Sequence, residues 1–284
     1  MELLKPISSR ARSLRLHYRL RDSLAGKHDH LAKRHDDCLP NFIIIGAAKS
    51  ATTSLAKVLA KHPDIHFSSA KEPKFFGRNY LRGWDWYAHF FEAGRAQALR
   101  GEASTMYSSS GHEFQFTPQL IHHHLGVIKL IYLVRHPLKR IVSHWRHYRG
   151  KHPECPEFHD ILRNRSMRKR IVDTSLYHQQ LKRYLDFFPA DMIHCMMYED
   201  LISRPKKTLS SMFSFLGIKP RLGKILKKGK IPTRNVAGSK GRNLIEVPEY
   251  SSRLKSELID VVRPDAELML QHMGRPLDSW DWSL

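Results

Sequence analysis

Cysteine is scarce in this 284-residue chain. Its three cysteines, Cys38, Cys155 and Cys195, lie far apart and form no C-x-x-C pair. The sequence therefore predicts neither a disulfide framework nor a thiolate metal site, and this cysteine usage fits a reducing compartment. Internal repeats and long linkers are also missing, and the chain is long enough to bury one good hydrophobic core.

A long apolar run is missing from the first 37 residues, where leucines are interspersed with arginines. No stretch of about 18–20 apolar residues is present, so this segment cannot span a bilayer, and no signal-peptide core is visible. We interpret residues 1–37 as a basic N-terminal arm and residues 38–284 as a single domain. The arm could lie on an anionic membrane surface, or it could pack on the domain as a helix or fray in part.

Acidic side chains are few, since 27 Asp and Glu stand against 48 Lys and Arg and leave a net charge of +21. So large an excess indicates an anionic partner, which could be a small anion, an anionic substrate, a membrane or nucleic acid. A nucleic-acid-binding surface would gather basic and stacking aromatic residues on one face. Because the basic residues are spread along the whole chain, we expect no nucleic-acid partner.

The pattern of elements along the chain alternates strands with helices, which is typical of an α/β fold with helices on both faces of the sheet. Beyond the motifs below, it predicts a helix over 176–187, a strand over 192–198, and helices over 204–216 and 251–272. Residues 152–169 are charged and poor in apolar side chains. They predict an exposed loop or a short irregular helix.

The most informative stretch is residues 41–55, NFIIIGAAKSATTSL. Its apolar residues 42–45 predict a buried parallel strand. The small residues 46–48 let the backbone approach an anion closely, and residues 52–54 begin a helix whose free N–H groups favour phosphate. The alternative is an ordinary corner between a strand and a helix.

The spacing within this stretch differs from that of Walker-type nucleotide kinases and ATPases, which need G-x-x-x-x-G-K-[ST]. The residue five after Gly46 is Ala51, and the lysine comes early, at Lys49. The shorter loop fits a smaller anion than a triphosphate, such as the 5′-phosphate of an adenosine nucleotide that carries one more group.

Residues 49–53, KSATT, resemble the 5′-phosphosulfate loop of the sulfotransferases, which move a sulfuryl group from 3′-phosphoadenosine 5′-phosphosulfate (PAPS) to an acceptor. The family usually has glycines at Ser50 and Ala51, and an alanine there is costly if its φ is positive. The resemblance implies a P-loop-like, three-layer α/β/α fold with a central parallel sheet. It also implies that the donor is bound by Lys49, Ser50, Ala51, Thr52, Thr53 and Ser54. Lys49 would in addition stabilise the charge that develops on the leaving nucleotide.

A second segment, residues 129–149, contains an apolar strand over 130–134 that ends at Arg135. It resembles the family's 3′-phosphate site, in which Arg135 and Ser143 would clasp the phosphate. Arginine offers a rigid fork of donors for this task, and serine adds a short hydroxyl contact. Without the family, a surface arginine in a salt bridge is the alternative.

A third segment, residues 238–242, is close to the K-G-R loop that closes over the nucleotide in many of these enzymes. The resemblance implies that Ser239, Lys240, Gly241 and Arg242 also bind PAPS. The alternative is a solvated basic loop.

On the acceptor side, residues 69–91 read K-E-P-x-F-F followed by W-x-W-Y. This pattern resembles the glycan-modifying branch, which includes the heparan-sulfate N-deacetylase/N-sulfotransferases and 3-O-sulfotransferases. The resemblance implies that Glu72 is the general base that takes the proton of the acceptor hydroxyl or amine. The alternative is an ion pair of Glu72 with Lys71 or Lys74, which at a surface contributes only ~0–1 kcal/mol.

Several further residues are candidates for acceptor contact. Glu102 could be a second acidic group at the acceptor, or a strand-end residue buried against Ser104 and the backbone. The heparan-sulfate enzymes carry a lysine where this chain has Ala103. Their mode of acceptor binding therefore cannot be assumed for this chain. The remaining candidates are Lys74, His147 and Tyr177, the last of which could instead pack in the core.

Three consecutive histidines, His122, His123 and His124, raise the question of a metal. Consecutive residues on a helix point in different directions, and a zinc site needs further ligands at suitable spacing. We therefore expect no metal.

Together these features predict an enzyme that moves the sulfuryl group of PAPS to a glycan or glycolipid, which could be anionic, by direct in-line transfer without a metal. The alternatives are a small phenolic, lipid or peptide acceptor, or a non-enzymatic basic protein that binds nucleic acid or glycan. Golgi relatives carry an N-terminal anchor, whereas residues 1–37 contain no apolar run long enough to serve as one. We therefore expect a bacterial, cytoplasmic enzyme that could associate with the inner face of the membrane through its basic arm.

Overall fold

The computed structural model describes residues 9–226, 231 and 245–283. Its sheet has five parallel strands in the order β2-β3-β1-β4-β5. The strands are β1 (Phe42–Gly46), β2 (Ile65–Phe67), β3 (Leu99–Ala103), β4 (Lys129–Val134) and β5 (Ile193–Met197). Strand β1 is central, and Phe42 pairs with Gly101 of β3 on one side and with Lys129 of β4 on the other. The predicted central parallel sheet is confirmed.

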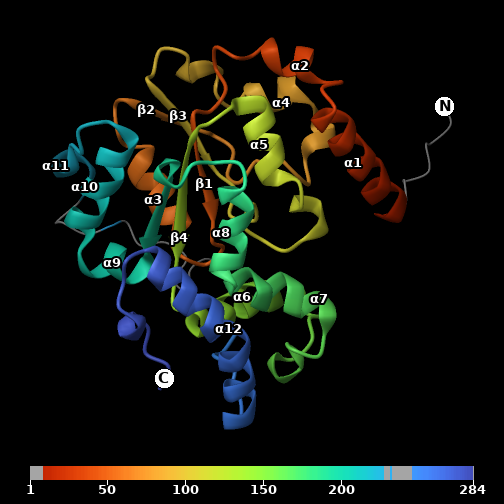
Figure 1. Ribbon diagram of the computed structural model, residues 1–284, viewed down its shortest axis with the longest axis vertical. Coiled ribbons are helices and arrows are strands. Elements are labelled where there is room, and N and C mark those ends of the chain that lie inside the picture. The colour runs from red at the N-terminus through yellow and green to blue at the C-terminus, as the bar shows by residue number, and fades with distance from the viewer. Residues whose placement is uncertain (1–8, 227–230, 232–244, 284) are drawn as a thin grey trace.

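The two faces of the sheet are separated by the alternation of side chains along each strand. On β1, Phe42 and Ile44 join the apolar cluster that includes residues of α3 and α10, whereas Ile43 and Ile45 join the cluster of α5 and α8. Figure 1 shows these two helix layers on opposite sides of the sheet. The predicted three-layer α/β/α arrangement is therefore confirmed.

The helices agree with the predicted ranges at most positions. Those that cover the sheet or follow its strands are α3 (Thr52–Leu59), α5 (Thr117–Leu125), α6 (Pro137–Arg149), α8 (Tyr177–Leu185), α9 (Tyr198–Ser203), α10 (Pro205–Leu216) and α12 (Ser252–His272). The remaining α-helices are α1 (Ser9–Leu24), α2 (Asp29–Lys33), α4 (Trp84–Ala88), α7 (Arg165–Met167) and α11 (Leu222–Ile225).

A third apolar cluster lies where β4 ends, between α6, α12 and the chain around α7 (Figure 1). Of the two structures predicted over 152–169, an exposed loop and a short irregular helix, the irregular helix is confirmed, because the segment forms short helical turns. The expected exposure needs correction, since Phe158, Ile161 and Met167 are buried. These few apolar side chains pack with Trp145 of α6 and Leu258 of α12, which a count of charged residues does not reveal.

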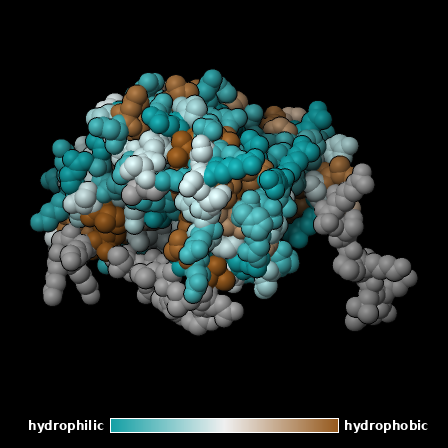
Figure 2. All heavy atoms as spheres, turned by 90° about the horizontal axis from the view of Figure 1, so that it is seen from below, coloured by the Kyte–Doolittle hydropathy of each residue, from teal (hydrophilic) through white to brown (hydrophobic). Residues whose placement is uncertain are grey.

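The described part of the N-terminal arm, residues 9–37, contains α1 and α2, and α1 packs on the domain. Leu16 and Leu20 of α1 are buried in the same cluster as apolar residues of α5, while Leu14 and Tyr18 are exposed. Among the described helices, none is both long and apolar enough to cross a membrane. The face seen in Figure 2 is mostly hydrophilic, and its hydrophobic side chains lie in small separate groups.

Candidate functional site

Parallel strands bring the predicted nucleotide-binding segments to one edge of the sheet. The chain leaves β1 toward Lys49 and leaves β4 directly into Arg135, and β1 and β4 are neighbours. In open α/β sheets this carboxyl edge is where ligands bind. The Arg135 guanidinium donates from Nη1 to the Lys49 carbonyl oxygen at 3.2 Å. Two segments 86 residues apart therefore meet at this point.

The backbone of the first loop is unusual. Lys49 and Ala51 have φ angles of 76° and 65°, and Ala51 is the residue that precedes α3. Ala51 thus has the positive φ at which alanine is less favourable than the glycine that is usual in the family. Ser50 does not have a positive φ. At Gly46 an added Cβ would lie 1.8 Å from the Ser108 hydroxyl oxygen, so no larger residue fits there.

The loop contains polar groups suited to an anion. Helix α3 starts at Thr52, and the first N–H groups of a helix lack intrahelical acceptors. Ser50 Oγ and Arg135 Nε are buried and have no hydrogen-bond partner among the described residues. Buried donors without partners are rare in native proteins. Phosphate oxygens would satisfy both groups, so the residues present fit an adenosine phosphosulfate.

Arg135 is held from two sides. Its guanidinium lies over the Tyr198 ring, 4.6 Å from the ring centre. The Tyr177 hydroxyl donates to the Arg135 carbonyl oxygen at 2.6 Å. Tyr177 is fully buried, and burial raises the pKa of its hydroxyl to about 12. Of the two interpretations of Tyr177, the structure agrees with packing in the core, where it supports the backbone of Arg135.

Ser143 and His147 lie on α6, the helix that Arg135 precedes. Both side chains are half-buried. Since they are four residues apart, they share one face of the helix. The other predicted nucleotide contacts, Ser239, Lys240, Gly241 and Arg242, lie outside the described residues.

Arg140 is a residue of this site that the sequence interpretation missed. It is fully buried on α6, and no carboxylate among the described residues pairs with it. Its Nη1 donates to the Ala48 carbonyl oxygen at 3.3 Å and to His144 Nδ1 at 3.0 Å, and its Nε donates to Ser175 Oγ at 2.6 Å. A buried cation without a counter-ion is costly. A bound phosphate next to the Ala48–Lys49 loop would supply the missing negative charge.

The Arg140 contact also sets the state of His144. Arginine has no acceptor, so His144 Nδ1 must carry the lone pair and Nε2 the proton. Burial, with the nearby Arg140 charge, lowers the pKa of His144 well below its usual value. The ring is therefore neutral and presents an N–H donor. In sequence, an arginine in the middle of a charged helix gives no sign of burial.

Glu72 is fixed by contacts to the end of β3. Its Oε1 accepts from Thr105 Oγ1 at 3.1 Å, and its Oε2 lies 3.0 Å from Lys74 Nζ. The Lys74 N–H donates to Ser104 Oγ at 2.8 Å, which ties this loop to the same carboxyl edge. Both Glu72 and Lys74 have positive φ, and their side chains are only about a quarter exposed, 26% and 24%. The ion pair with Lys74 is thus present, within a structured loop rather than on a free surface.

The aromatic residues that follow Glu72 form the scaffold beneath it. Phe75 stacks on Tyr87 with ring centres 4.3 Å apart and planes 7° from parallel, and both are fully buried. Trp84 packs edge-on against Phe75 at 4.8 Å. The K-E-P-x-F-F and W-x-W-Y motifs therefore place Glu72 through this aromatic packing.

Glu102 lies inside the core beneath this loop. Its carboxylate accepts hydrogen bonds from the hydroxyls of Tyr87, Tyr107 and Ser104 at 3.0, 3.0 and 2.6 Å. Burial raises its pKa to about 7, against the opposing effect of these hydroxyls. Of the two interpretations of Glu102, the structure agrees with the buried strand-end residue. A contact with the acceptor would require it to be exposed.

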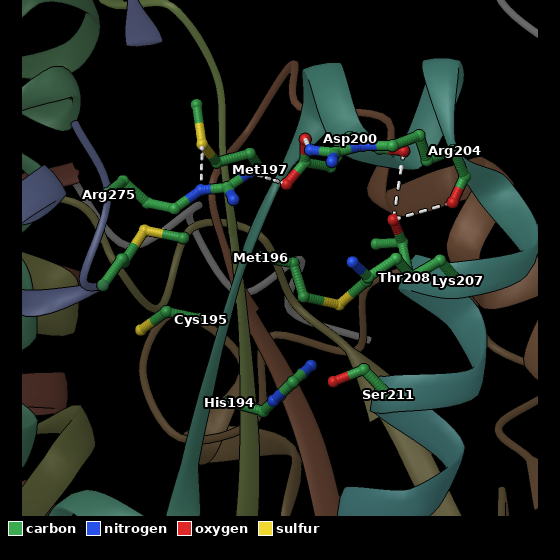
Figure 3. Close-up of a pocket in the computed structure, with 11 residues that line it drawn as sticks. His194, Cys195, Met196, Met197, Asp200, Arg204, Lys207, Thr208, Ser211 and Arg275 are labelled. Atoms are coloured by element: carbon green, nitrogen blue, oxygen red, sulfur yellow. Dashed lines mark hydrogen bonds and ion pairs between the residues drawn. The ribbon is translucent and has the colours of Figure 1, made fainter. Parts of the chain in front are cut away.

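A pocket away from these residues lies beside the edge strand β5 (Figure 3). Its lining includes Asp200, which forms ion pairs with Arg204 and Arg275. None of the predicted donor or acceptor residues lines it. The acidic and two of the basic groups are already paired with each other, so we do not assign the reaction to this pocket.

Comparison with known proteins identifies the family to which a chain with this parallel sheet and these two loops belongs. Residues 39–231 match the sulfotransferase domain family, and the chain belongs to this family. It is 33% identical over 189 residues to heparan sulfate glucosamine 3-O-sulfotransferase 3B1 of Mus musculus, which covers 64% of this chain and 47% of that protein. It is 26% identical over 287 residues to the bifunctional heparan sulfate N-deacetylase/N-sulfotransferase of Drosophila melanogaster, which covers 86% and 27%.

The chain thus spans about half the length, or less, of these curated relatives. Among solved structures, a sulfotransferase from Alicyclobacillus acidocaldarius superposes with a TM-score of 0.67 at 25% identity, covering 87% of this chain and 99% of that one. The predicted sulfotransferase family is confirmed, and proteins of the predicted glycan-modifying branch are among the relatives that the chain matches.

Proposed function

We propose that the protein transfers a sulfuryl group from PAPS to a hydroxyl or amine of a glycan or glycolipid, with Glu72 as general base. The observation that carries this proposal is the contact of the Arg135 guanidinium with the Lys49 carbonyl, which joins two phosphate-binding segments. Glu72 is tied to the same edge of the sheet by Thr105.

The donor site would be formed by the start of α3 and the loop before it. PAPS supplies an activated sulfuryl group when it is bound. The N–H groups at the start of α3 and the buried Ser50 hydroxyl would hold its 5′ end, and Arg135 with Ser143 would hold the 3′-phosphate. Buried Arg140 adds a fixed positive charge behind the loop.

Glu72 and Lys49 would carry the chemistry. Each carboxylate oxygen of Glu72 has one described side-chain partner, Thr105 or Lys74, which leaves a lone pair for the proton of the acceptor. Lys49 would place its ammonium where negative charge develops on the leaving group. Such preorganised charge is commonly worth ~3–4 kcal/mol of transition-state stabilisation. No proton transfer through Glu102 is needed, since its carboxylate is enclosed in the core.

A glycan acceptor is supported by the relatives, whose names refer to heparan sulfate. The net charge of +21 favours a glycan that is itself anionic. Ala103, in place of the lysine of those relatives, ends β3 beneath the Glu72 loop. We therefore infer that acceptor contacts on this side differ in detail. Association of the arm with an anionic membrane is a separate proposal, supported by the arginines of α1, Arg12, Arg15, Arg19 and Arg21.

The donor site is tested by calorimetric titration with 3′-phosphoadenosine 5′-phosphate, the desulfated product, beside AMP and ATP. We expect binding that requires the 3′-phosphate and is lost in Lys49→Ala and Arg135→Ala. Lys61→Ala, exposed just beyond α3, is the matched control and should bind as the wild type does. Equal binding of all three nucleotides, or none, would overturn the assignment of the donor.

The role of Glu72 is tested by Glu72→Gln in an assay with labelled PAPS and a heparan-type glycan. Loss of a general base lowers kcat by roughly 10²–10⁴-fold while nucleotide binding is retained. Glu113→Gln is the control, because Glu113 also pairs with a nearby basic residue, Arg78. Full turnover by Glu72→Gln would remove Glu72 from the mechanism. Binding of glycan without turnover in the wild type would favour a non-enzymatic glycan-binding protein.

A further inference from the structure

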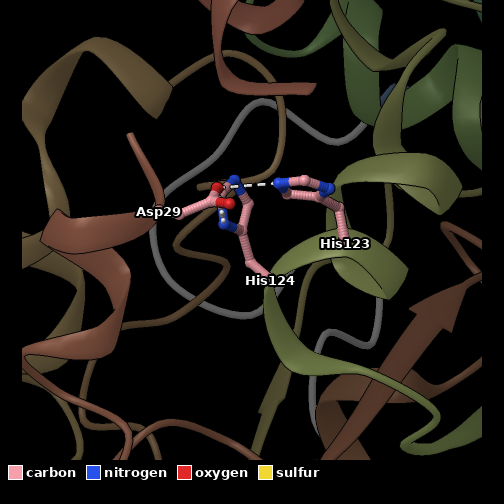
Figure 4. Close-up of side chains that lie close together, drawn as sticks. All are labelled: Asp29, His123 and His124. Carbon is pink, nitrogen blue, oxygen red and sulfur yellow. Dashed lines mark hydrogen bonds and ion pairs between the residues drawn. The ribbon is translucent and has the colours of Figure 1, made fainter. Parts of the chain in front are cut away.

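The three consecutive histidines of α5 have a neighbour that is remote in sequence. Asp29 begins α2 and lies against His123 and His124 (Figure 4). Asp29 Oδ1 is 2.7 Å from His123 Nε2 and 3.9 Å from His124 Nδ1. One ligand atom from each of these three residues lies within 4.8 Å of the others.

Consecutive residues of a helix diverge, and on that ground the sequence predicts no metal. Here the two rings nonetheless approach each other, with centres 4.7 Å apart and planes at 90°. They present Nε2 of His123 and Nδ1 of His124 to the same carboxylate. Asp29, which is 94 residues from His123 in the sequence, supplies the further ligand.

The orientation of the His124 ring is fixed by a second set of contacts. Its Nε2 lies 2.7 Å from Ser23 Oγ and 3.2 Å from the Tyr80 hydroxyl, and its ring packs against Trp84 at 4.7 Å. At 3.9 Å, Nδ1 is too far from Asp29 for a hydrogen bond. The proton is therefore better placed on Nε2, where Ser23 can accept it. The Nδ1 lone pair then faces the Asp29 carboxylate and is available to a metal ion. The Nε2 proton is held by Ser23, as the second ring N–H of a metal-ligating histidine is held by an outer partner.

We propose that Asp29, His123 and His124 bind a divalent transition-metal ion such as Zn²⁺. Zinc bonds of about 2.0–2.2 Å place tetrahedral ligands about 3.3 Å apart, and the two separations from Asp29 lie on either side of this value. The site opens to solvent on one side, since the Asp29 and His123 side chains are 38% and 29% exposed and that of His124 only 1%. Water can therefore enter and complete the coordination.

The bound ion would connect the N-terminal helices to the domain. Asp29 belongs to the segment that includes α1 and α2, and the two histidines belong to α5, which covers the sheet. The ion would be structural and would stabilise the packing of residues 9–33 on the domain. This role is independent of sulfuryl transfer, because none of its residues belongs to the candidate donor or acceptor site.

The test is a calorimetric titration of the chelator-treated full chain with Zn²⁺, repeated with Co²⁺ as a spectroscopic reporter of coordination. We expect one site that weakens by more than about tenfold in Asp29→Asn and in His123→Ala. His123 is partly exposed, so its variant should fold, which circular dichroism verifies. His30→Ala is the matched control, because His30 is exposed and adjacent to Asp29 but outside the cluster.

The chain has 19 histidines, so Zn²⁺ could also bind elsewhere. A second measurement distinguishes the proposed site from such binding. Hydrogen exchange of residues 9–33 should slow when Zn²⁺ is added to the wild type and to His30→Ala, but not to Asp29→Asn. If the wild type binds Zn²⁺ no more tightly than the two ligand variants, the proposal is overturned. The same holds if exchange of residues 9–33 does not respond to the ion.

Discussion

Positive φ angles concentrate at the candidate site. Among the described residues other than glycine, five have positive φ, and four of these are Lys49, Ala51, Glu72 and Lys74. Left-handed backbone costs an ordinary residue roughly 1–2 kcal/mol. Such strain persists where the surrounding structure imposes it, and it is common at ligand-binding sites. The strain here coincides with the two loops assigned to the donor and the acceptor.

Replacing Ala51 with glycine should therefore raise the free energy of unfolding, by up to about 1 kcal/mol. The gain is limited because glycine also adds entropy to the unfolded chain. Ala56→Gly, in the interior of α3, should instead lower the free energy by about 1 kcal/mol. Urea unfolding of both variants measures the difference. Equal losses in the two variants would mean that the φ of Ala51 stores no strain.

Glu102 should make stability depend on pH. Its pKa is 4.5 in the unfolded reference and about 7 in the folded protein, so between these values the folded state binds the extra proton. The stability of the wild type should then fall, relative to Glu102→Gln, as pH rises from about 4.5 to 7. Outside this interval the difference should be constant.

Urea unfolding at a series of pH values measures this difference. Glu249→Gln, which removes an exposed glutamate, is measured beside it as the control for loss of a surface carboxylate. A flat profile of the difference between the wild type and Glu102→Gln would show that Glu102 does not titrate as its burial requires.

At the scale of elements, α6 collects much of the site on one helix. It follows Arg135 and carries Ser143 and His147 as nucleotide or acceptor candidates, while Arg140 faces the Ala48 carbonyl in the core. The helix thus links the end of β4 to the loop after β1. It is therefore in contact with both halves of the candidate donor site.

Helix α1 is expected to be part of the folded unit. Leu20 is only 2% exposed, and Leu20→Ala should lower the free energy of unfolding by about 2–3 kcal/mol, since burial of its methyl groups is lost and a cavity remains. Leu14→Ala, at a side chain that is 53% exposed, should change it by less than about 0.5 kcal/mol. Thermal and urea unfolding compare the two. A neutral Leu20→Ala would mean that α1 frays in solution and does not pack.

At the scale of the whole molecule, the net charge of +21 should dominate encounters with polyanions. We expect affinity for heparan sulfate to fall steeply as NaCl is raised, because screening shortens the reach of the surface charges. A neutral glycan of similar length should show little dependence on salt. Calorimetry across a salt series, with duplex DNA as comparison, tests this.

Stronger binding to DNA than to the glycan would favour the nucleic-acid alternative and count against an anionic glycan. Equal, salt-independent binding of the charged and neutral glycans would show that the net charge does not determine which glycan is bound.

Much of the fold could be predicted because its signals are local. The strand, loop and helix at residues 42–59 follow from apolar residues, small residues and hydroxyls that are neighbours in the chain, and the same holds for residues 130–149. The segment 152–169 was harder, since a few apolar side chains outweigh its many charges once Trp145 and Leu258 cover them.

The order of elements, the family and the location of the two candidate phosphate-binding segments could thus be predicted from the amino-acid sequence alone. The burial of Arg140, Glu102 and Tyr177, and the contact of Asp29 with His123, became visible only in the folded molecule. The physical reason is that burial and hydrogen bonding depend on which segments the sheet and its helices bring together. Local pattern carries no record of a partner many tens of residues away.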